Sequence, residues 1–297
     1  MSEPPRAAPR VMAAVVTYNR RDVLRQCLTA LITQTRPPDE VVVVDNASVD
    51  GTETMVTQEF PSVRLVRMPE NTGAAGGFAE CLRQGSLGGY DWVWAFNDDD
   101  IPEPHALGTM LEAVPQLPPR TGIVACERHN AEGQQYSIGL LWQHRHKPVF
   151  SAGTGAMSVP VDIVTFSCTL VSSALVAEVG VPRSDFFMMA EDLEYCLRAR
   201  RAGWGVQVLR QDLVSALAMG STGVPPPWRG YYQTRNQLAM TLSRQSVPEL
   251  WWWAVRTVKF CVGAIVVRDR MAERIRLRML GTWHALRGVS GRTILPG

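Results

Sequence analysis

The sequence predicts an α/β protein with a mainly parallel sheet and a helical C-terminal appendix. Over the first 130 residues, short apolar runs alternate with segments whose apolar positions have helical spacing. Such alternation is typical of βαβ units, in which strands buried on both faces read as continuous apolar runs. From Trp228 to the end of the chain, the pattern is helical throughout.

Before residue 100, the predicted elements alternate strictly between strand and helix. Val11–Thr17 has the composition of a buried strand, and the helical pattern after it stops at Pro37, because proline cannot continue a helix. A glycine-rich turn at Asn71–Gly77 opens a later helix. In chain order the elements are strand 11–17, helix 24–32, strand 41–44, helix 52–60, strand 63–66, helix 74–84 and strand 92–96.

After residue 100 the pattern is less regular. The predicted elements are helix 104–114, strand 123–126, a polar stretch at 128–160, strand 166–171, helix 190–203 and a loop at 220–227. The loop separates two predicted parts of the chain. A flexible tail at 1–10 is followed by an α/β domain at 11–227 and a helical region at 228–297.

The composition is that of an ordinary globular protein, with 46% hydrophobic and 20% charged residues. The six cysteines are scattered without a CxxC pair, so we expect buried free thiols and a reducing cytosol. Met1–Arg10 is polar and lacks the apolar core of a signal peptide. The most apolar helical stretch, Leu250–Val267, contains Arg256 and Lys259 and is not expected to span a membrane.

The C-terminal 47 residues are basic, with nine Arg or Lys and two Asp or Glu in 251–297. Three consecutive tryptophans, Trp251–Trp253, precede these charges. Arginine mixed with tryptophan is typical of a helix that lies on an anionic membrane surface. The alternative is a helical subdomain whose tryptophans pack against the body of the protein or a second subunit. The sequence leaves both interpretations open.

The strongest functional signal is the run Asp98-Asp99-Asp100, which directly follows the apolar strand 92–96. Three like charges at one strand end repel each other unless a cation holds them together. Carboxylates suit Mg²⁺ or Mn²⁺, which usually share their site with substrate phosphates. Taken alone, the run is more typical of a solvated acidic turn.

The ends of the other predicted strands favour the functional interpretation. Strand 11–17 ends in Thr17-Tyr18-Asn19 and strand 41–44 in Asp45-Asn46. In parallel sheets, ligands bind outside the carboxyl ends of the strands. We therefore expect these side chains to meet the acidic run at one edge, where the helix opener from Asn71 to Gly77 adds backbone N–H groups for a phosphate or ribose.

Two of these residues suit recognition of a nucleotide base. The Tyr18 ring can stack on a base or simply cap the sheet edge. The Asp45 carboxylate can accept a hydrogen bond from the imide N–H of uracil or thymine, or can cap the turn that follows it.

Together these motifs resemble glycosyltransferase family 2, whose members are inverting enzymes with a GT-A fold that use nucleotide-diphosphate sugars. The resemblance covers residues 11–240 and rests on several motifs at once. The segment 187–200 resembles the family segment with the catalytic carboxylate, and 232–236 resembles bacterial rhamnosyl- and galactofuranosyltransferases. The motifs are 15–20, 43–52, 71–73, 98–100, 187–200 and 232–236.

The resemblance implies a Rossmann-like nucleotide-sugar-binding domain and a role for each motif. Asp192 would be the general base, with Glu191 as its rival. Asp98 and Asp100 would contact the metal and the donor ribose, with Asp99 near the sugar. The predicted donor-binding residues are Thr17, Tyr18, Asn19, Asp45, Asn71, Gly73, Asp98, Asp99, Arg229 and Arg235.

One departure from the family concerns the metal. Many relatives place a histidine on the strand after helix 190–203, whereas here 213–219 contains none. Metal binding is therefore expected to be weak, completed by the donor diphosphate, or dispensable. Arg229 or Arg235 would supply positive charge to the diphosphate.

The resulting prediction is an inverting enzyme that transfers a sugar, of the rhamnose or galactofuranose type, from a UDP- or dTDP-sugar. The acceptor would be a hydroxyl of a lipid-linked envelope glycan or a natural product. The alternatives are a non-catalytic nucleotide-sugar-binding module and a sugar nucleotidyltransferase. The expected location is the cytoplasm, with peripheral contact to the inner face of the membrane or a homodimer through the C-terminal helices. No nucleic-acid partner is expected.

Overall fold

The computed structural model describes residues 8–130, 133, 139–141, 147–149, 155–217, 225–267 and 269–295. Most of the predicted tail and part of the predicted loop at 220–227 lie outside these residues. The first elements are β1 (Val11–Thr17), α1 (Arg21–Ile32), β2 (Glu40–Asp45), α2 (Thr52–Glu59), β3 (Arg64–Arg67), α3 (Gly73–Leu87) and β4 (Trp92–Asn97). All seven match the predicted alternation.

The remaining elements fall into a second half of the body and a helical end. The second half contains β5 (Asp100–Pro102), α4 (Ala106–Ala113), β6 (Thr121–Asn130), β7 (Gly139–Leu141), β8 (Lys147–Val149), β9 (Ser158–Pro160), β10 (Thr169–Ser172), α5 (Ser173–Val179), α6 (Glu191–Arg201) and β11 (Gly205–Ala216). The helical end consists of α7 (Pro227–Ser243), α8 (Val247–Val267) and α9 (Met271–Leu286).

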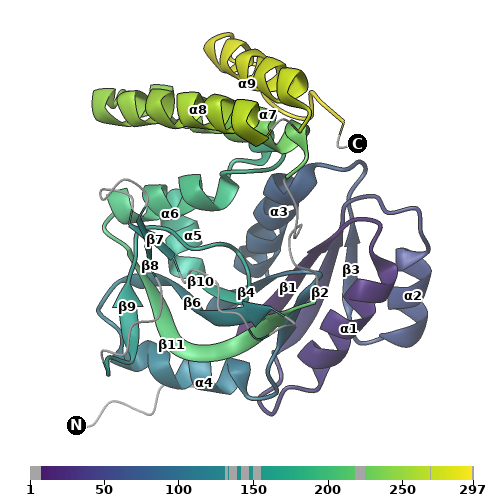
Figure 1. Cartoon of the computed structure of the whole chain (residues 1–297). Coiled ribbons are helices and arrows are strands. Elements are labelled where there is room, and N and C mark those ends of the chain that lie inside the picture. The colour runs from purple at the N-terminus through teal and green to yellow at the C-terminus, as the bar shows by residue number, and fades with distance from the viewer. Residues whose placement is uncertain are drawn as a thin grey trace.

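A sheet in the order β3-β2-β1-β4-β10-β6-β11-β5 runs through the body, and β9 pairs with β11 (Figure 1). The strands from β3 to β4 are parallel, as predicted. Their register aligns Thr17 with Asp45 and Val16 with Asn97, so their carboxyl ends share one edge.

Beyond β4 the sheet is mixed, because β10 lies antiparallel between β4 and β6. The strand predicted at 166–171 begins only at Thr169. Before it, the backbone turns: Ser167 N–H donates to the Thr165 carbonyl, and Cys168 has a φ of +50°. β11 is a single strand whose irregular register between Leu209 and Val214 bends it along β6.

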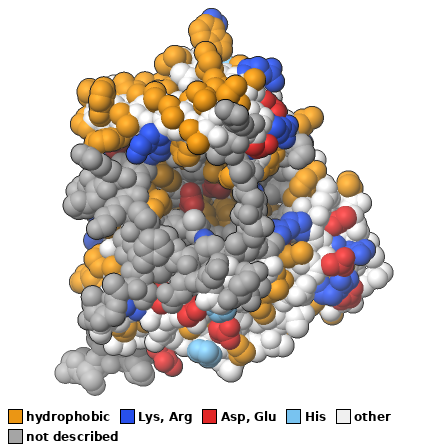
Figure 2. Space-filling model, viewed as in Figure 1, with side chains coloured by type: hydrophobic (Ala, Val, Ile, Leu, Met, Phe, Trp, Pro, Cys, Tyr) orange, Lys and Arg blue, Asp and Glu red, His pale blue; other side chains and the backbone are white. Residues whose placement is uncertain are grey.

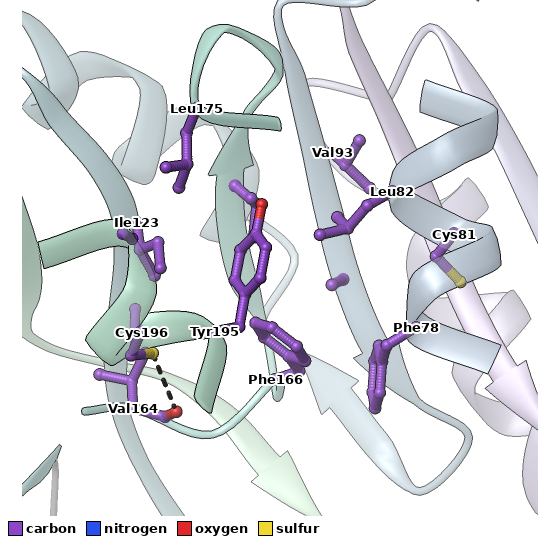
Figure 3. Packing of buried hydrophobic residues seen from close by; sticks show 14 of the residues in the cluster. Phe78, Cys81, Leu82, Val93, Ile123, Val164, Phe166, Leu175, Tyr195 and Cys196 are labelled. Atoms are coloured by element: carbon purple, nitrogen blue, oxygen red, sulfur yellow. Dashed lines mark hydrogen bonds between the residues drawn. The ribbon is translucent and has the colours of Figure 1, made fainter. Parts of the chain in front are cut away.

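The strands bury both faces under helices. Along β1, Met12, Ala14 and Val16 face a core beneath α3, α5 and α6, while the alternate residues face a second core beneath α1, α2 and α4. Figure 3 shows the first core, where the Phe166 ring lies between Phe78, at 5.0 Å, and Tyr195, at 5.8 Å. This two-sided burial explains why the strands read as continuous apolar runs.

The cysteines behave as predicted for free thiols. No disulfide joins them in the described residues; Cys261 is half-buried and the other five are buried. In Figure 3 the Cys196 thiol donates to the Val164 carbonyl at 3.6 Å.

The three C-terminal helices lie together over one end of the body (Figure 1). α9 packs on α7, where the Tyr231 hydroxyl lies 2.6 Å from His284 Nδ1. The prediction that the chain is helical to its end is wrong, because α9 ends at Leu286. Residues after it run back over α7, and the Tyr232 hydroxyl donates to the Ile294 carbonyl at 2.7 Å.

None of the helices in the described part of the chain combines the length and the apolar character of a membrane span.

Candidate functional site

The acidic run ends β4 and is held by the first strand and its helix. Asp98 accepts a hydrogen bond from the Thr17 hydroxyl at 2.8 Å and forms an ion pair with Arg20 at 2.7 Å. Arg20 also contacts Asp99, at 3.2 Å. The structure thus joins Thr17 to the acidic run across the parallel β1–β4 pair, as strand-end convergence predicts. Arg20 belonged to the recognised motif but was not predicted as a site residue.

Asp100 is the most enclosed carboxylate of the run. It is 2% exposed and accepts hydrogen bonds from the Ser167 hydroxyl, at 2.7 Å, and the Asn97 N–H, at 3.0 Å. Burial raises the pKa of Asp100 to about 6, and burial likewise raises the pKa of Asp98 to about 6 despite the nearby Arg20. Two such groups gain stability from a bound cation, because it offsets the cost of burying their charge.

Asp45 ends β2 and is completely buried. Its Oδ1 accepts a hydrogen bond from the Ser48 N–H at 3.0 Å, whereas Oδ2 has no hydrogen-bond partner and lies 3.7 Å from an Arg67 nitrogen. A buried acceptor without a donor is costly. Asp45 therefore caps its turn through one oxygen, while the other is buried near Arg67 without a hydrogen-bond donor.

Tyr18 and Asn19 follow β1 and differ in their surroundings. Tyr18 is 40% exposed and its ring is open to a stacking partner. The Asn19 side-chain oxygen instead accepts a hydrogen bond from the Val49 N–H at 2.8 Å, and its backbone N–H donates to Ser48 Oγ. Asn19 thus ties the two strand-end loops together and gives the predicted donor site its shape.

The backbone N–H groups at the start of α3, predicted to approach a phosphate or ribose, are partly used by other residues of the protein. The Asn71 side-chain oxygen accepts a hydrogen bond from the Gly73 N–H at 2.8 Å, and the Ala75 N–H donates to the Phe187 carbonyl at 3.0 Å. Gly73 has a φ of +71°, and a Cβ there would lie 1.9 Å from the Phe187 oxygen. Gly73 is therefore required by the close approach of the 187 backbone, which occupies part of the helix N-terminus.

Asp192, in the first turn of α6, lines a cavity of about 350 Å³ together with Arg128, Ser167 and other residues of β6, 163–167 and α7. Glu191 is buried, has an unpartnered Oε2 and does not line this cavity. Burial raises the pKa of both carboxyls, and the neighbouring Asp192 charge raises that of Glu191 further. The geometry thus distinguishes the two rivals, because Asp192 alone faces the open space.

Arg128 joins the two acidic centres. It lies on β6 in the wall of the cavity, and its positive charge partly offsets the raised pKa of both Asp100 and Asp192. Ser167 links the same centres, since it lines the cavity and donates to Asp100. Neither residue was predicted, because only the folded chain brings 128 and 167 beside 100 and 192.

The described residues alone do not supply a complete set of ligands for a divalent cation. In the described residues no three His, Cys, Asp or Glu side chains are grouped around a possible ion. Ser215 and Ala216, in the segment where relatives place a histidine, pair with Ile101 and Asp100. Two buried carboxylates fit Mg²⁺ or Mn²⁺ only where substrate phosphates complete the coordination.

Comparison with known proteins identifies the family. The sequence model described as Glycosyl transferase family 2 matches residues 13–180, which is more than half of the chain. This chain belongs to glycosyl transferase family 2. The matched segment includes Asp45 and the acidic run but ends before Asp192, so the assignment of Asp192 rests on its own geometry.

Two curated relatives are similar over longer stretches. Galactofuranosyltransferase GlfT1 of Mycolicibacterium smegmatis is 29% identical over 65% of this chain and 66% of its own length. The alignment therefore spans slightly less than two thirds of that relative. N-acetylglucosaminyl-diphospho-decaprenol L-rhamnosyltransferase of Mycobacterium tuberculosis is 25% identical over 89% of this chain and 92% of its own length.

Among solved structures, Staphylococcus aureus TarS is similar with a TM-score of 0.55 and 17% identity, over 78% of this chain and 39% of that protein. A likeness at this identity concerns the fold alone. Together with the family match, it confirms the predicted GT-A, Rossmann-like α/β fold. The chain thus carries a glycosyltransferase domain of family 2.

Arg235 of this family 2 domain corrects a prediction. It was expected at the donor diphosphate, but it is 1% exposed within α7. Its guanidinium donates to the carbonyls of Phe186, at 3.0 Å, and Gly291, at 2.8 Å, and it contacts Thr293. Arg235 therefore joins α7 to two loops, and among the described residues no hydrogen bond or ion pair links it to the acidic run.

The contact with Phe186 also supports the segment 186–190, which directly precedes α6 and Asp192. Phe187, Met189 and Ala190 have φ values of +63°, +67° and +73°, which non-glycine residues rarely adopt. Asn236 holds this segment through its side-chain amide, which donates to the carbonyls of residues 186, 188 and 189 at 2.8–3.0 Å. Strained backbone of this kind persists only where the surrounding contacts over-determine it.

Arg229 lies outside the acidic centre. It lines a second cavity between α7, α8 and α9 and stacks over Trp228, with 5.5 Å between its guanidinium carbon and the ring centroid. Among the described residues, no contact joins it to the acidic run. Its predicted role at the donor diphosphate has no support in this geometry.

Proposed function

We propose that this protein is an inverting glycosyltransferase that moves a sugar from a UDP- or dTDP-sugar to an acceptor hydroxyl. The observation that carries the proposal is the position of Asp192 in a cavity whose wall, through Arg128 and Ser167, adjoins the buried acidic run. In this arrangement Asp192 faces the cavity, while Asp98 and Asp100 form a separate buried pair that suits a diphosphate-bound cation.

The reaction is a single displacement. The acceptor oxygen attacks the anomeric carbon, and the bond from that carbon to the diphosphate oxygen breaks, so the nucleoside diphosphate leaves with the electron pair. Asp192 takes the proton from the acceptor hydroxyl. A carboxylate whose pKa is raised by burial is a better proton acceptor near neutral pH than an exposed one, provided that it is ionised.

The base of the donor would lie at the ends of β1 and β2. The Oδ2 of Asp45, which has no hydrogen-bond partner, suits the imide N–H of uracil or thymine, and the exposed ring of Tyr18 suits stacking on the base. The names of the two relatives favour galactofuranose or rhamnose as the sugar.

Asp98 and Asp100 would hold Mg²⁺ or Mn²⁺ when the donor diphosphate supplies the remaining ligands. The cation would offset the negative charge that develops on the departing diphosphate. Because the described residues supply few ligands, we propose that the metal binds weakly until the donor is present.

For the acceptor, we propose a lipid-linked glycan of the bacterial cell envelope, which the rhamnosyltransferase relative supports by its name. The protein would act in the cytoplasm at the inner face of the membrane. Exposed apolar side chains on α8 and α9 support a peripheral contact there, and a homodimer through the same helices is the alternative.

The test is nucleoside diphosphate release from a panel of UDP- and dTDP-sugars, with and without acceptor. Asp192→Asn should lower the transfer rate by a factor on the order of 10²–10⁴, because a positioned base is lost. Its donor affinity should be almost unchanged. Glu191→Gln is the matched control and should retain most of the activity. Normal turnover in Asp192→Asn, with collapse in Glu191→Gln, would reassign the base.

A further inference from the structure

A second cavity, of about 330 Å³, lies between the C-terminal helices and the loop 225–227. Its lining carries four cationic side chains from three helices: Arg229 of α7, Lys259 of α8, and Arg274 and Arg278 of α9. Among the lining residues that the structure describes, none is Asp or Glu. A cavity in which the charged side chains of the described lining are all positive attracts an anion of high charge.

Most of this charge is uncompensated. Arg274 pairs with Asp269 at 2.6 Å, and the nearby Glu273 pairs with Arg270. In the described residues, no ion pair joins Arg229, Lys259 or Arg278 to a carboxylate. Burial, and more weakly the charge of Arg274, lower the pKa of Arg278. The charge of Arg278 is therefore disfavoured by its surroundings, and a bound anion would offset that cost.

The second cavity adjoins the cavity of Asp192. Met189 and Gln233 line both of them, so one wall is shared. A molecule that fills both would present one end to Asp192 and an anionic part to the cationic cluster. Figure 2 shows a hollow with acidic side chains on its floor beneath the helical layer.

The outer surface beside the second cavity is apolar. Phe260, Gly263 and Ala264 of α8 line the cavity, and the neighbouring Val262, 53% exposed, and Val266, 75% exposed, face solvent. Figure 2 shows apolar side chains gathered over this helical layer. An anion that binds here therefore has an apolar surface directly next to it, which suits a molecule with a charged head and a hydrocarbon chain.

We propose that the cluster of Arg229, Lys259 and Arg278 binds the diphosphate of a lipid-linked acceptor. The acceptor sugar extends past Met189 and Gln233, which line both cavities, towards Asp192. The hydrocarbon chain lies over the apolar surface of α8. This inference rests on the proposed function for the acceptor chemistry. In this proposal the second cavity binds the acceptor diphosphate, and the donor diphosphate binds at the acidic run.

The probe is farnesyl diphosphate, which has the same head group on a short apolar chain. Its dissociation constant for the full-length protein is measured by calorimetry, together with that of inorganic pyrophosphate. Lys259→Gln and Arg229→Gln should each weaken farnesyl diphosphate binding about tenfold, as expected for loss of a charge-assisted contact. Arg276→Gln is the matched control, because Arg276 is exposed on α9 outside this lining.

UDP binding separates the two sources of diphosphate. The variants should bind UDP as the wild type does, and saturating UDP should not displace farnesyl diphosphate. Displacement by UDP would show that the donor uses this cavity, and equal affinity for pyrophosphate would show a simple anion site; either result overturns the proposal. Unchanged farnesyl diphosphate binding in both variants also overturns it, even where sugar transfer is normal. Tight farnesyl diphosphate binding without transfer from any nucleotide sugar would instead contradict the proposed function alone.

Discussion

Individual carboxylates in this molecule differ in how folding changes their ionisation. Burial raises the pKa of Asp100 to about 6, whereas hydrogen bonds from Arg21 and Arg25 lower the pKa of the exposed Asp22 to about 2. Folding therefore favours the protonated form of Asp100 and the ionised form of Asp22. The two residues contribute to the pH dependence of stability with opposite signs.

A stability measurement on metal-free protein tests this difference. Folding raises the pKa of Asp100, so ionisation of this carboxyl lowers the stability of the folded protein. The loss is complete above about pH 6 and fades as the pH falls towards 3.8, the ordinary pKa of an aspartate. Asp100→Asn should therefore raise the free energy of unfolding by about 2 kcal/mol at neutral pH, with little difference near pH 4. Asp22→Asn should be destabilising at neutral pH. Equal effects of Asp100→Asn at both pH values would contradict the buried, protonation-linked state.

The sequence indicates candidate site residues where charges are concentrated in a few consecutive positions, and their roles stay predictions. The acidic run, Asp45 and Asp192 follow from charges at strand ends and from motifs. Arg128 was missed because a single arginine in a polar stretch has no local feature that marks its neighbours. The role of Arg235 was wrong for a related reason: the sequence shows a cation on a helix but not the carbonyls of Phe186 and Gly291 that accept its hydrogen bonds.

Among the elements, those with a strong local pattern were predicted correctly and those defined by distant partners were not. β1 and β2 are apolar on both faces because helices cover both sides, so their sequence alone indicates their environment. The antiparallel insertion of β10 between β4 and β6 depends on pairing between segments far apart in the chain. No local pattern encodes the direction of that pairing.

The contact between the start of α3 and the strained segment gives an element-scale prediction. Gly73→Ala should be strongly destabilising, by about 2–4 kcal/mol, because its Cβ would overlap the Phe187 carbonyl and because its φ is positive. It should also lower sugar transfer, since Phe187 belongs to the segment before Asp192.

Gly89→Ala is the control, with a φ of +68° and no atom within 4 Å of the added Cβ. Its cost should be only about 1–2 kcal/mol. Similar melting temperatures for the two variants would refute a special role for the contact at Gly73.

At the scale of the whole molecule, the helical layer is joined to the body by more than the chain itself. Tyr231 and Tyr232 of α7 are fully buried against α9 and the residues after it, and Arg235 reaches both Phe186 and Gly291. Removal of residues 251–297 should therefore leave apolar and charged groups of α7 exposed or unpaired. We expect the truncated chain to aggregate or melt well below the full chain, as measured by scanning calorimetry. A stable, donor-binding fragment ending at residue 250 would contradict this expectation and would show that α8, α9 and the residues after them are separable from the rest.

The outer face of the same layer gives the last prediction. Val266 on α8 and Met279 on α9 are 75% and 67% exposed, which is unusual for clustered apolar side chains, and arginines lie among them. If this face rests on an anionic membrane, full-length protein should sediment with anionic vesicles at low salt and be released at high salt, because part of the attraction is screened. The double variant Val266→Ser, Met279→Ser should sediment several-fold less. Val49→Ser is the matched control, since Val49 is 85% exposed but lies in the β2–α2 loop. If neither protein binds vesicles and the double variant instead changes from dimer to monomer in size-exclusion chromatography, the exposed face is a subunit interface.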